Sequence, residues 1–156
     1  MSLVYLESTV VSYYAARPSR DLIIAAHQQI TIEWWESVLP SLDPCISQFV
    51  IDEISRGDAE AAKKRLRVIE DFNVLRMLPE IAELAMKYNR EIGIPQKCLT
   101  DAYHMALSVY HGLDYLVTWN CTHIASARVR GIVRNINDSL GLVTPVICTP
   151  EELMEV

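Results

Sequence analysis

The feature that most constrains the fold is an alternation between short apolar runs and longer stretches with helical periodicity. The short runs are typical of buried strands, and they cover residues 3–6, 45–46, 74–78, 115–118 and 146–148. Between them, apolar residues recur every three or four positions, as they do on one face of a helix. Strands that alternate with helices favour a mostly parallel sheet. We therefore expect an α/β fold with helices on both faces of the sheet.

Capping residues, glycines and prolines predict where the helices begin and end. The expected helices cover about residues 19–38, 49–54, 58–69, 79–93, 100–112 and 127–136. Asp58 is expected to cap a helix, Pro79 to begin one and Gly93 to end it. Thr149 and Glu152 have the spacing of a capping box, which predicts a short final helix. The polar segment after the first strand, at Glu7, is expected to be a tight turn.

Size and composition exclude several classes of protein. The 156 residues suit a single domain that spans residues 1–156. Hydrophobic residues make up 51% of the chain and charged residues 22%, which excludes wholesale disorder. The net charge of −6 argues against a general nucleic-acid coat protein, although it allows one basic groove. No apolar run approaches the roughly 18 residues of a membrane span.

The four cysteines give no sign of a disulfide framework. Cys45, Cys98, Cys121 and Cys148 are far apart in sequence, and neither a C-x-x-C pair nor a signal peptide is present. We expect reduced, mostly buried thiols in a cytoplasmic protein. Cys121 lies near His123, but no second pair of ligands stands at zinc-binding spacing, so the sequence predicts no zinc site.

Acidic and amide side chains follow the predicted strands, at the edge where α/β sheets bind ligands. Glu7 follows the first strand, and Glu53 lies on the helix after the second. Asp101 begins the helix before the fourth strand, and Asn120 follows that strand. If these groups converge, they need a compensating cation, and oxygen ligands favour Mg²⁺ or Mn²⁺. Such ions promote phosphodiester hydrolysis.

Each acid also has an ordinary structural interpretation. Glu53 has the sequence context of a solvated helix face, and Asp101 has the context of a helix cap. Glu7 is harder to explain in this way, because it comes directly after an N-terminal strand. His104 is one helical turn after Asp101 and so can lie on the side of the helix that faces the site, although we expect a packed, hydrogen-bonded residue instead.

Two further groups of residues are candidates for binding. Arg17 and Arg20 come shortly after Glu7, and we expect them to hold a substrate backbone better than the basic run at residues 63–67, which is typical of a solvated helix face. Trp34 and Trp35 diverge by about 100° on a helix, so at most one can face the core squarely. The other is expected to contact a second subunit or a partner protein.

Four segments resemble the PIN-domain family in order and spacing. They cover residues 4–10, 50–54, 100–107 and 114–124, and the last two are the most specific. The resemblance extends over essentially the whole chain. It implies a three-layer α/β/α sandwich with a parallel sheet of about five strands and an acidic site for Mg²⁺ or Mn²⁺. Many members of the family are ribonucleases, and many small bacterial members are toxins of the VapC type that pair with an antitoxin.

The resemblance also implies which residues form the site. The family's four acidic positions fall on Glu7, Glu53, Asp101 and Asn120, as catalytic and metal-binding residues. A hydroxyl that is common two residues before the fourth acid falls on Thr118, where it can orient a metal-bound water. Glu7 is longer than the usual Asp, and Asn120 lacks the charge of the usual Asp. These departures are expected to weaken metal binding and put a second metal ion in doubt.

The function that follows from the resemblance is a Mg²⁺- or Mn²⁺-dependent endoribonuclease for single-stranded or looped RNA. We expect a homodimer whose partners are RNA and an antitoxin protein, as in a type II toxin–antitoxin pair. The alternative is a PIN-like scaffold with weak or no catalysis that binds RNA or protein. A dinucleotide-binding fold and a P-loop are excluded, since residues 7–12 contain no glycine.

Overall fold

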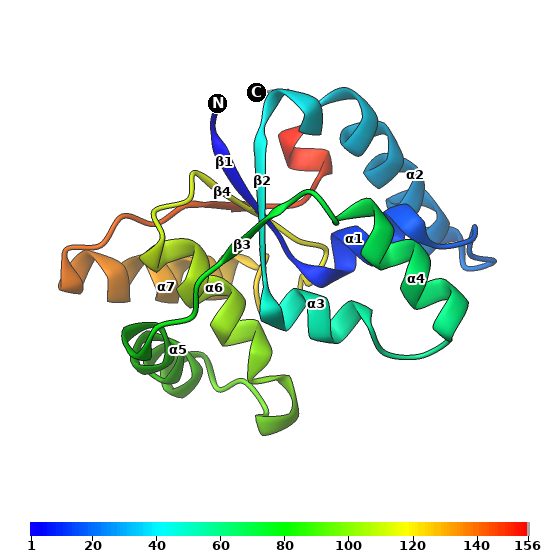
Figure 1. Cartoon of the computed structure of the whole chain (residues 1–156). Coiled ribbons are helices and arrows are strands. Elements are labelled where there is room, and N and C mark those ends of the chain that lie inside the picture. Colours follow the sequence, from blue (N-terminus) through cyan, green and yellow to red (C-terminus); the bar gives the residue numbers. More distant parts are fainter. Residues whose placement is uncertain (156) are drawn as a thin grey trace.

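A computed structural model of the chain describes residues 1–155, and it contains one five-stranded sheet. The strands are β1 (Leu3–Leu6), β2 (Asp43–Ser47), β3 (Asn73–Leu75), β4 (Tyr115–Val117) and β5 (Val146–Cys148). All four pairings are parallel, in the order β3-β2-β1-β4-β5 (Figure 1). The predicted α/β class and the five-stranded parallel sheet are confirmed.

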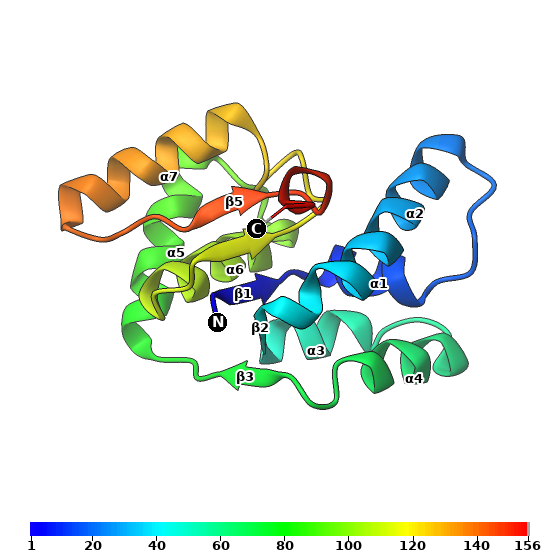
Figure 2. The same cartoon turned by 90° about the horizontal axis from the view of Figure 1, so that it is seen from above.

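Helices cover both faces of the sheet. They are α1 (Ser8–Ala15), α2 (Leu22–Ser37), α3 (Gln48–Ile54), α4 (Ala59–Val68), α5 (Pro79–Ile92), α6 (Thr100–Tyr110) and α7 (Ala127–Leu140). Helix α1 contacts α2, α3 and α4 in one layer, and α5 contacts α6 and α7 in the other (Figures 1 and 2). Right-handed crossovers in opposite directions from the centre of the sheet produce these two layers. Within residues 1–155, no helix combines the length and hydropathy needed to cross a membrane.

The direction of the chain across the sheet reverses between β1 and β4. From β1 the chain proceeds outward to β2 and β3, whereas β4 and β5 lie on the other side of β1. Leu6 pairs with Val117, and the backbone N–H of Glu7 donates to the carbonyl of Val117 at 3.1 Å. The residues after β1 and β4 are therefore neighbours at the carboxyl edge, which is where open α/β sheets bind ligands.

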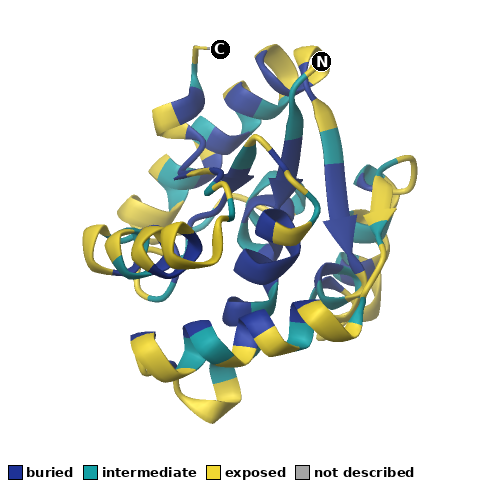
Figure 3. Cartoon of the chain, turned by 90° about the vertical axis from the view of Figure 1, so that its left-hand side faces the viewer, coloured by how far each residue is buried: buried dark blue, intermediate teal, exposed yellow. Residues whose placement is uncertain are grey.

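The core is built around the central strand. Val4, Tyr5 and Leu6 of β1 are fully buried, as expected for a parallel strand covered on both faces. Figure 3 shows the buried residues gathered on the central strands and on the helix faces turned toward them. Trp34 of α2 is also fully buried.

The contact of Trp34 or Trp35 with a second subunit or a partner protein stays a prediction, and the structure leaves only Trp35 part of its surface for it. Trp35 is half-buried, and its ring stacks on Tyr14 with centroids 4.2 Å apart and on Phe72 with centroids 5.7 Å apart. The chain itself therefore covers much of this side chain. Leu22 and Ile23, at the start of α2, are the most exposed apolar residues of this helix, with exposed fractions of 87% and 70%.

Most of the predicted boundaries are confirmed. Asp58 accepts a hydrogen bond from the Ala61 N–H, and Gly93 ends α5 with a φ of 79°, in the left-handed region that glycine adopts readily. Thr149 and Glu152 form reciprocal side chain–backbone hydrogen bonds, although the helix that follows is only a 3₁₀ turn, η3 (Glu151–Leu153).

Two local predictions are wrong. The segment after β1 is not a turn, because α1 begins at Ser8 and Glu7 occupies the N-cap position with an extended backbone. The third strand is shorter than predicted and ends at Leu75. Leu75 pairs with Ser47, the last residue of β2, so β2 offers no pairing partner for the residues after Leu75.

Candidate metal centre

Glu7 lies at the junction of β1 and α1 and has only 3% of its surface exposed. Its Oε1 accepts hydrogen bonds from the hydroxyl of Thr118, at 2.6 Å, and from the hydroxyl of Thr9. Burial raises the pKa of this carboxyl, and the nearby charge of His104 and the two hydroxyl hydrogen bonds only partly oppose that effect. Glu7 is therefore a recessed carboxylate fixed from both β4 and α1.

Glu53 lies on α3, the helix after β2, and one of its carboxylate oxygens is within 4.8 Å of a carboxylate oxygen of Glu7. Its Oε1 accepts a hydrogen bond from the Ser8 hydroxyl at 2.8 Å and is 2.6 Å from Nε2 of His104. Burial raises the pKa of Glu53, but the hydrogen bond and charge of His104 and the Ser8 hydroxyl outweigh it, so the pKa is lowered overall. Unlike a residue on a solvated face, Glu53 is directed inward.

His104 of α6 is hydrogen-bonded to Glu53 and lies near Glu7. Its side chain is fully buried, its Nδ1 is 2.6 Å from the Tyr5 hydroxyl, and that hydroxyl is 2.7 Å from the Ser47 hydroxyl. Burial lowers the pKa of His104, but the hydrogen bond to Glu53 and the surrounding carboxylate charges raise it overall. One candidate ligand atom from each of His104, Glu7 and Glu53 lies within 4.8 Å of the others.

His104 is packed and hydrogen-bonded, as its sequence context predicts, but its contact with Glu53 was not predicted. The only signal in the sequence is its spacing of one helical turn from Asp101, which puts both residues on one face of α6. That spacing does not identify Glu53 as the partner, because the contact depends on how α3 packs against α6.

Asp101 lies in the first turn of α6, where only 8% of the residue is exposed. Its Oδ2 is 2.8 Å from Nδ1 of His123. It belongs to a second group of candidate ligand atoms, with His123 and Cys98, whose members also lie within 4.8 Å of one another. The structure thus brings Glu7 and Glu53 together and holds Asp101 in a neighbouring group, one helical turn from His104.

Asn120 and Thr118 shape the loop that follows β4. The backbone N–H of Asn120 donates to the Thr118 hydroxyl at 2.9 Å, and Oδ1 of Asn120 accepts from the His123 N–H at 3.0 Å. Because the Thr118 hydroxyl proton is directed at Glu7, its role in this structure is to hold that carboxylate. The Asn120 oxygen fixes the turn and retains a second lone pair.

Trp119 attaches this loop to the first helical layer. Its backbone N–H donates to the Thr9 hydroxyl at 2.9 Å, and its indole N–H donates to the Thr31 hydroxyl of α2 at 2.7 Å. The indole stacks on His27 of α2 with centroids 4.0 Å apart and planes 10° apart. The loop is therefore held by α1 and α2 in addition to β4.

The three carboxylates share a feature that suits a hard cation. Each is held by protein groups through one oxygen, namely Oε1 of Glu7, Oε1 of Glu53 and Oδ2 of Asp101. Within residues 1–155, the other oxygen of each carboxylate makes no hydrogen bond to the protein. Free carboxylate oxygens on a rigid frame are the ligands that Mg²⁺ and Mn²⁺ prefer, so the residues present fit such an ion.

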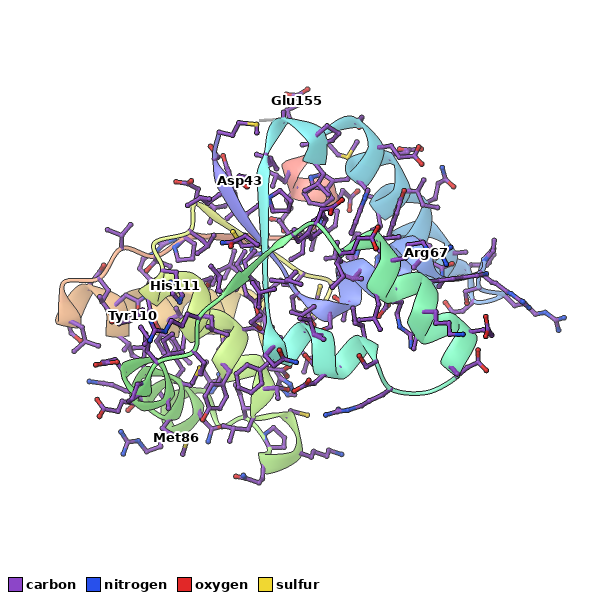
Figure 4. All side chains as sticks on the ribbon, in the orientation of Figure 1. Asp43, Arg67, Met86, Tyr110, His111 and Glu155 are labelled. Atoms are coloured by element: carbon purple, nitrogen blue, oxygen red, sulfur yellow. The ribbon has the colours of Figure 1, made fainter. Side chains whose placement is uncertain are left out.

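The predicted phosphate-binding arginines are on the surface. Arg17 and Arg20 are both exposed, and Arg17 lines a hollow of mixed charge that also includes Lys64 and Arg65 of α4 and the acids Asp58 and Glu60. Part of the basic run that sequence reasoning assigned to a solvated face is thus next to Arg17. Arg67 extends from the same helix (Figure 4).

Comparison with known proteins gives a likeness of fold. No sequence profile of a known family matches the chain, and no curated protein matches it in sequence. Among solved structures, the chain is similar to one chain in a crystal structure of VapBC2 from Rickettsia felis bound to a DNA fragment from their promoter. The TM-score is 0.57 with 10% sequence identity, over 94% of this chain and 98% of that chain. The likeness therefore supports, at the level of the fold, the PIN-like architecture that the sequence motifs predict.

Proposed function

We propose that the chain is a metal-dependent ribonuclease with a PIN-like fold. The observation that carries the proposal is the pair of recessed glutamates, Glu7 and Glu53, which lie at the point of strand reversal and each retain one carboxylate oxygen without a protein partner. Glu7 is buried and Glu53 is partly buried, and two ionised carboxylates this close are costly without a cation. A divalent metal ion supplies that charge.

In this proposal the ion is Mg²⁺ or Mn²⁺, held by Glu7, Glu53 and Asp101 and by the amide oxygen of Asn120. When bound, such an ion activates water and stabilises the charge that develops at phosphorus. Thr118 keeps the Glu7 carboxylate in place through its 2.6 Å hydrogen bond. The chain's contribution is thus a fixed set of oxygen ligands whose geometry is established before the substrate arrives.

The depth of the site supports a single-stranded or looped RNA substrate. Glu7 and Asp101 have exposed fractions of 3% and 8%, so a regular A-form helix cannot bring its phosphates to them. A flexible strand can bend into the site. Arg17 and Lys64 provide positive charge for the flanking phosphates of a strand, although Asp58 and Glu60 line the same hollow and Arg65 is hydrogen-bonded to the carbonyls of Ile54 and Arg56.

We also propose that the chain is the toxin of a cytoplasmic toxin–antitoxin pair and forms a homodimer. The similarity of its fold to a chain of the VapBC2 assembly supports a partner protein. The exposed Leu22 and Ile23 supply apolar surface for a protein contact at the start of α2. Sedimentation of the chain at about 100 μM, well above the ~1 μM scale of moderate affinity, tests the homodimer. A monomer at that concentration contradicts it.

The test of the catalytic proposal is Mn²⁺-dependent cleavage of single-stranded RNA. Asp101→Asn and Glu53→Gln are each expected to reduce the rate about 10²-fold or more, the scale of losing a key electrostatic group. Asp52→Asn is the matched control, because Asp52 is exposed on the same helix as Glu53 and bonds only to Gln48. Full activity in EDTA, or unreduced cleavage by Asp101→Asn, contradicts the proposal.

One observation favours the alternative, a binding scaffold with little or no catalysis. His104 is hydrogen-bonded to Glu53 and lies near Glu7, and these carboxylates raise its pKa, so a protonated His104 offsets part of their charge without a metal. A scaffold of this kind binds single-stranded RNA equally well with and without Mn²⁺ and does not cleave it. Calorimetric titration of Mn²⁺ separates the two functions, since the nuclease requires saturable metal binding that is lost in Glu53→Gln.

A further inference from the structure

The second group of ligand atoms differs chemically from the first. It contains the thiol of Cys98, the carboxylate of Asp101 and the imidazole of His123, whose ligand atoms lie within 4.8 Å of one another. Asp101 is buried, whereas Cys98 and His123 are partly exposed. An ion from solvent can therefore reach the group without any rearrangement of the core.

The backbone holds these three residues in place. Cys98 ends the short 3₁₀ helix η2 (Gln96–Cys98), which continues directly into α6 through the hydrogen bond from the Ala102 N–H to the Leu99 carbonyl. Cys98 and Asp101 are three residues apart on this helical run and so lie on one face. His123 comes from the loop after β4, where its own N–H donates to Asn120 Oδ1.

A thiolate, an imidazole and a carboxylate form a ligand set for zinc rather than for magnesium. Zinc binds sulfur and nitrogen readily, and three protein ligands leave a fourth tetrahedral position for water. With metal–ligand bonds of about 2.0–2.3 Å, tetrahedral ligand atoms lie roughly 3.3–3.8 Å from one another. Asp101 Oδ2 and His123 Nδ1, which are 2.8 Å apart in the metal-free structure, therefore have to separate slightly, and the Cys98 sulfur, which lies within 4.8 Å of the group, has to approach by about 1 Å.

We propose that Cys98, Asp101 and His123 form a zinc site beside the Mg²⁺ or Mn²⁺ centre. The sequence did not predict it because Cys121, the cysteine next to His123 in sequence, is exposed and stands outside the group. The cysteine that reaches His123 is 25 positions earlier in the chain. Only the approach of η2 and α6 to the loop after β4 brings them together.

Zinc at this site has a direct consequence for the other metal centre. Asp101 contributes to both ligand sets, so a zinc ion bound through Cys98 and His123 withdraws Asp101 from the catalytic ion. Zinc is then an inhibitor that acts by removing a shared ligand. This inhibition rests on the proposed nuclease function, whereas zinc binding does not.

Binding is tested with Co²⁺ and Zn²⁺ on the full chain. Co²⁺ is expected to produce a thiolate-to-cobalt charge-transfer band that Zn²⁺ abolishes by displacement. Cys98→Ser is expected to lose the band and to bind Zn²⁺ at least tenfold more weakly, while the matched control Cys121→Ser keeps both properties. Loss of the band in Cys121→Ser, or equal zinc affinity in Cys98→Ser and the unmodified chain, overturns the proposal.

Two further variants protect this test against a folding defect. His123→Gln removes a ligand from a surface loop and is expected to weaken zinc binding at least tenfold. Glu53→Gln changes only the neighbouring group and is expected to leave zinc affinity within about twofold. If His123→Gln binds zinc normally, or if Glu53→Gln loses it, the assigned ligands are wrong.

Inhibition is measured as cleavage at fixed Mn²⁺ with increasing Zn²⁺, each protein relative to its own zinc-free rate. The zinc concentration for half inhibition is expected to rise at least tenfold in Cys98→Ser and to stay unchanged in Cys121→Ser. Equal inhibition of both variants overturns the regulatory half of the proposal. If no cleavage occurs at all, the nuclease proposal fails, while the cobalt and zinc titrations still decide the site.

Discussion

The two halves of the candidate site occupy one edge of the sheet but are built differently. Glu7 occupies the N-cap position of α1, Glu53 and His104 come from α3 and α6, and each is tied to neighbouring groups by short hydrogen bonds. His104 is fully buried and Glu53 has 23% of its side chain exposed, whereas Asp101 and His123 are 11% and 23% exposed. The histidine of the first half lies in the core, and the histidine of the second lies on a partly exposed loop.

This difference shows how one site can combine ligands that are fixed in advance with ligands that adjust when an ion binds. Elements packed into the core fix the positions of the glutamates before any ion binds, which limits the reorganisation needed on binding. A loop and a 3₁₀ turn carry the other half, and such segments adjust at lower cost. Each of the following changes alters one half and leaves the other as an internal reference.

The largest effect on stability is expected from removing the imidazole beside the glutamates. His104→Gln deletes a fully buried ring that is hydrogen-bonded to Glu53 and Tyr5, so we expect the metal-free protein to lose about 3 kcal/mol of unfolding free energy. His111→Gln is the control, because His111 follows the last turn of α6, away from Asp101 in the first turn, and its ring lies beside Tyr110 (Figure 4) and the carbonyl of Arg76. Urea unfolding in EDTA measures both variants.

Metal ions sharpen the same experiment. Mn²⁺ is expected to restore part of the stability that His104→Gln loses, since the ion supplies the missing positive charge between Glu7 and Glu53. If Mn²⁺ stabilises the variant no more than it stabilises His111→Gln, the ion does not bind between the glutamates.

An intermediate effect is expected at Asn120, where the chain departs from the acidic pattern of the PIN family. Asn120→Asp adds a negative charge to the half of the site that contains Asp101 and His123, and Asp can still accept the hydrogen bond from the His123 N–H. We expect Mn²⁺ to bind about tenfold more tightly, roughly 1.4 kcal/mol. Calorimetric titration of both proteins checks this, and equal or weaker binding means that Asn120 does not ligate the ion.

The smallest effect is expected at Glu7 in the metal-free protein. Burial raises the pKa of Glu7, so the folded state disfavours its ionised form. Glu7→Gln is expected to stabilise the protein at neutral pH by about 1 kcal/mol, as loss of a strained functional group often does.

The pH dependence of this gain has a definite sign. Because the folded pKa of Glu7 is raised, protonation stabilises the fold at low pH, and that contribution is lost as the pH rises through the folded pKa. The advantage of Glu7→Gln should therefore be present at pH 7 and vanish near the ordinary pKa of about 4.3. Thermal melts in EDTA at both pH values measure it, and an equal gain at both contradicts this origin.

Local signals in the sequence were sufficient for much of the fold. The cap at Asp58, the first helical residue Pro79 and the stop at Gly93 each act within a few residues, so the structure shows them where they were predicted. The central position of β1 agrees with its apolar run at residues 3–6. The start of α1 at Ser8 was missed, because Glu7 forms no side-chain cap and instead directs its carboxylate to Thr118.

The sequence could predict only those site residues that follow the carboxyl ends of the strands, because these ends lie together at one edge of the sheet. Glu7 and Thr118 follow adjacent parallel strands, which a strand pattern and a family resemblance can indicate. The contacts of His104 with Glu53 and of His123 with Asp101 join segments that are distant in sequence. Such pairs depend on how helices and loops pack, and no periodicity or cap signals them.

The stacking of Trp119 on His27 gives the chain its own optical reporter. Trp34 is sealed in the core and Trp35 is covered by Tyr14, whereas Trp119 stands directly between two residues of the candidate site. An imidazole in face-to-face contact quenches indole fluorescence, more strongly when it is protonated. A shift of the loop after β4 changes that contact at 4.0 Å. A change at the candidate metal centre that moves this loop is therefore expected to change the emission of Trp119, against the signal of the other two tryptophans.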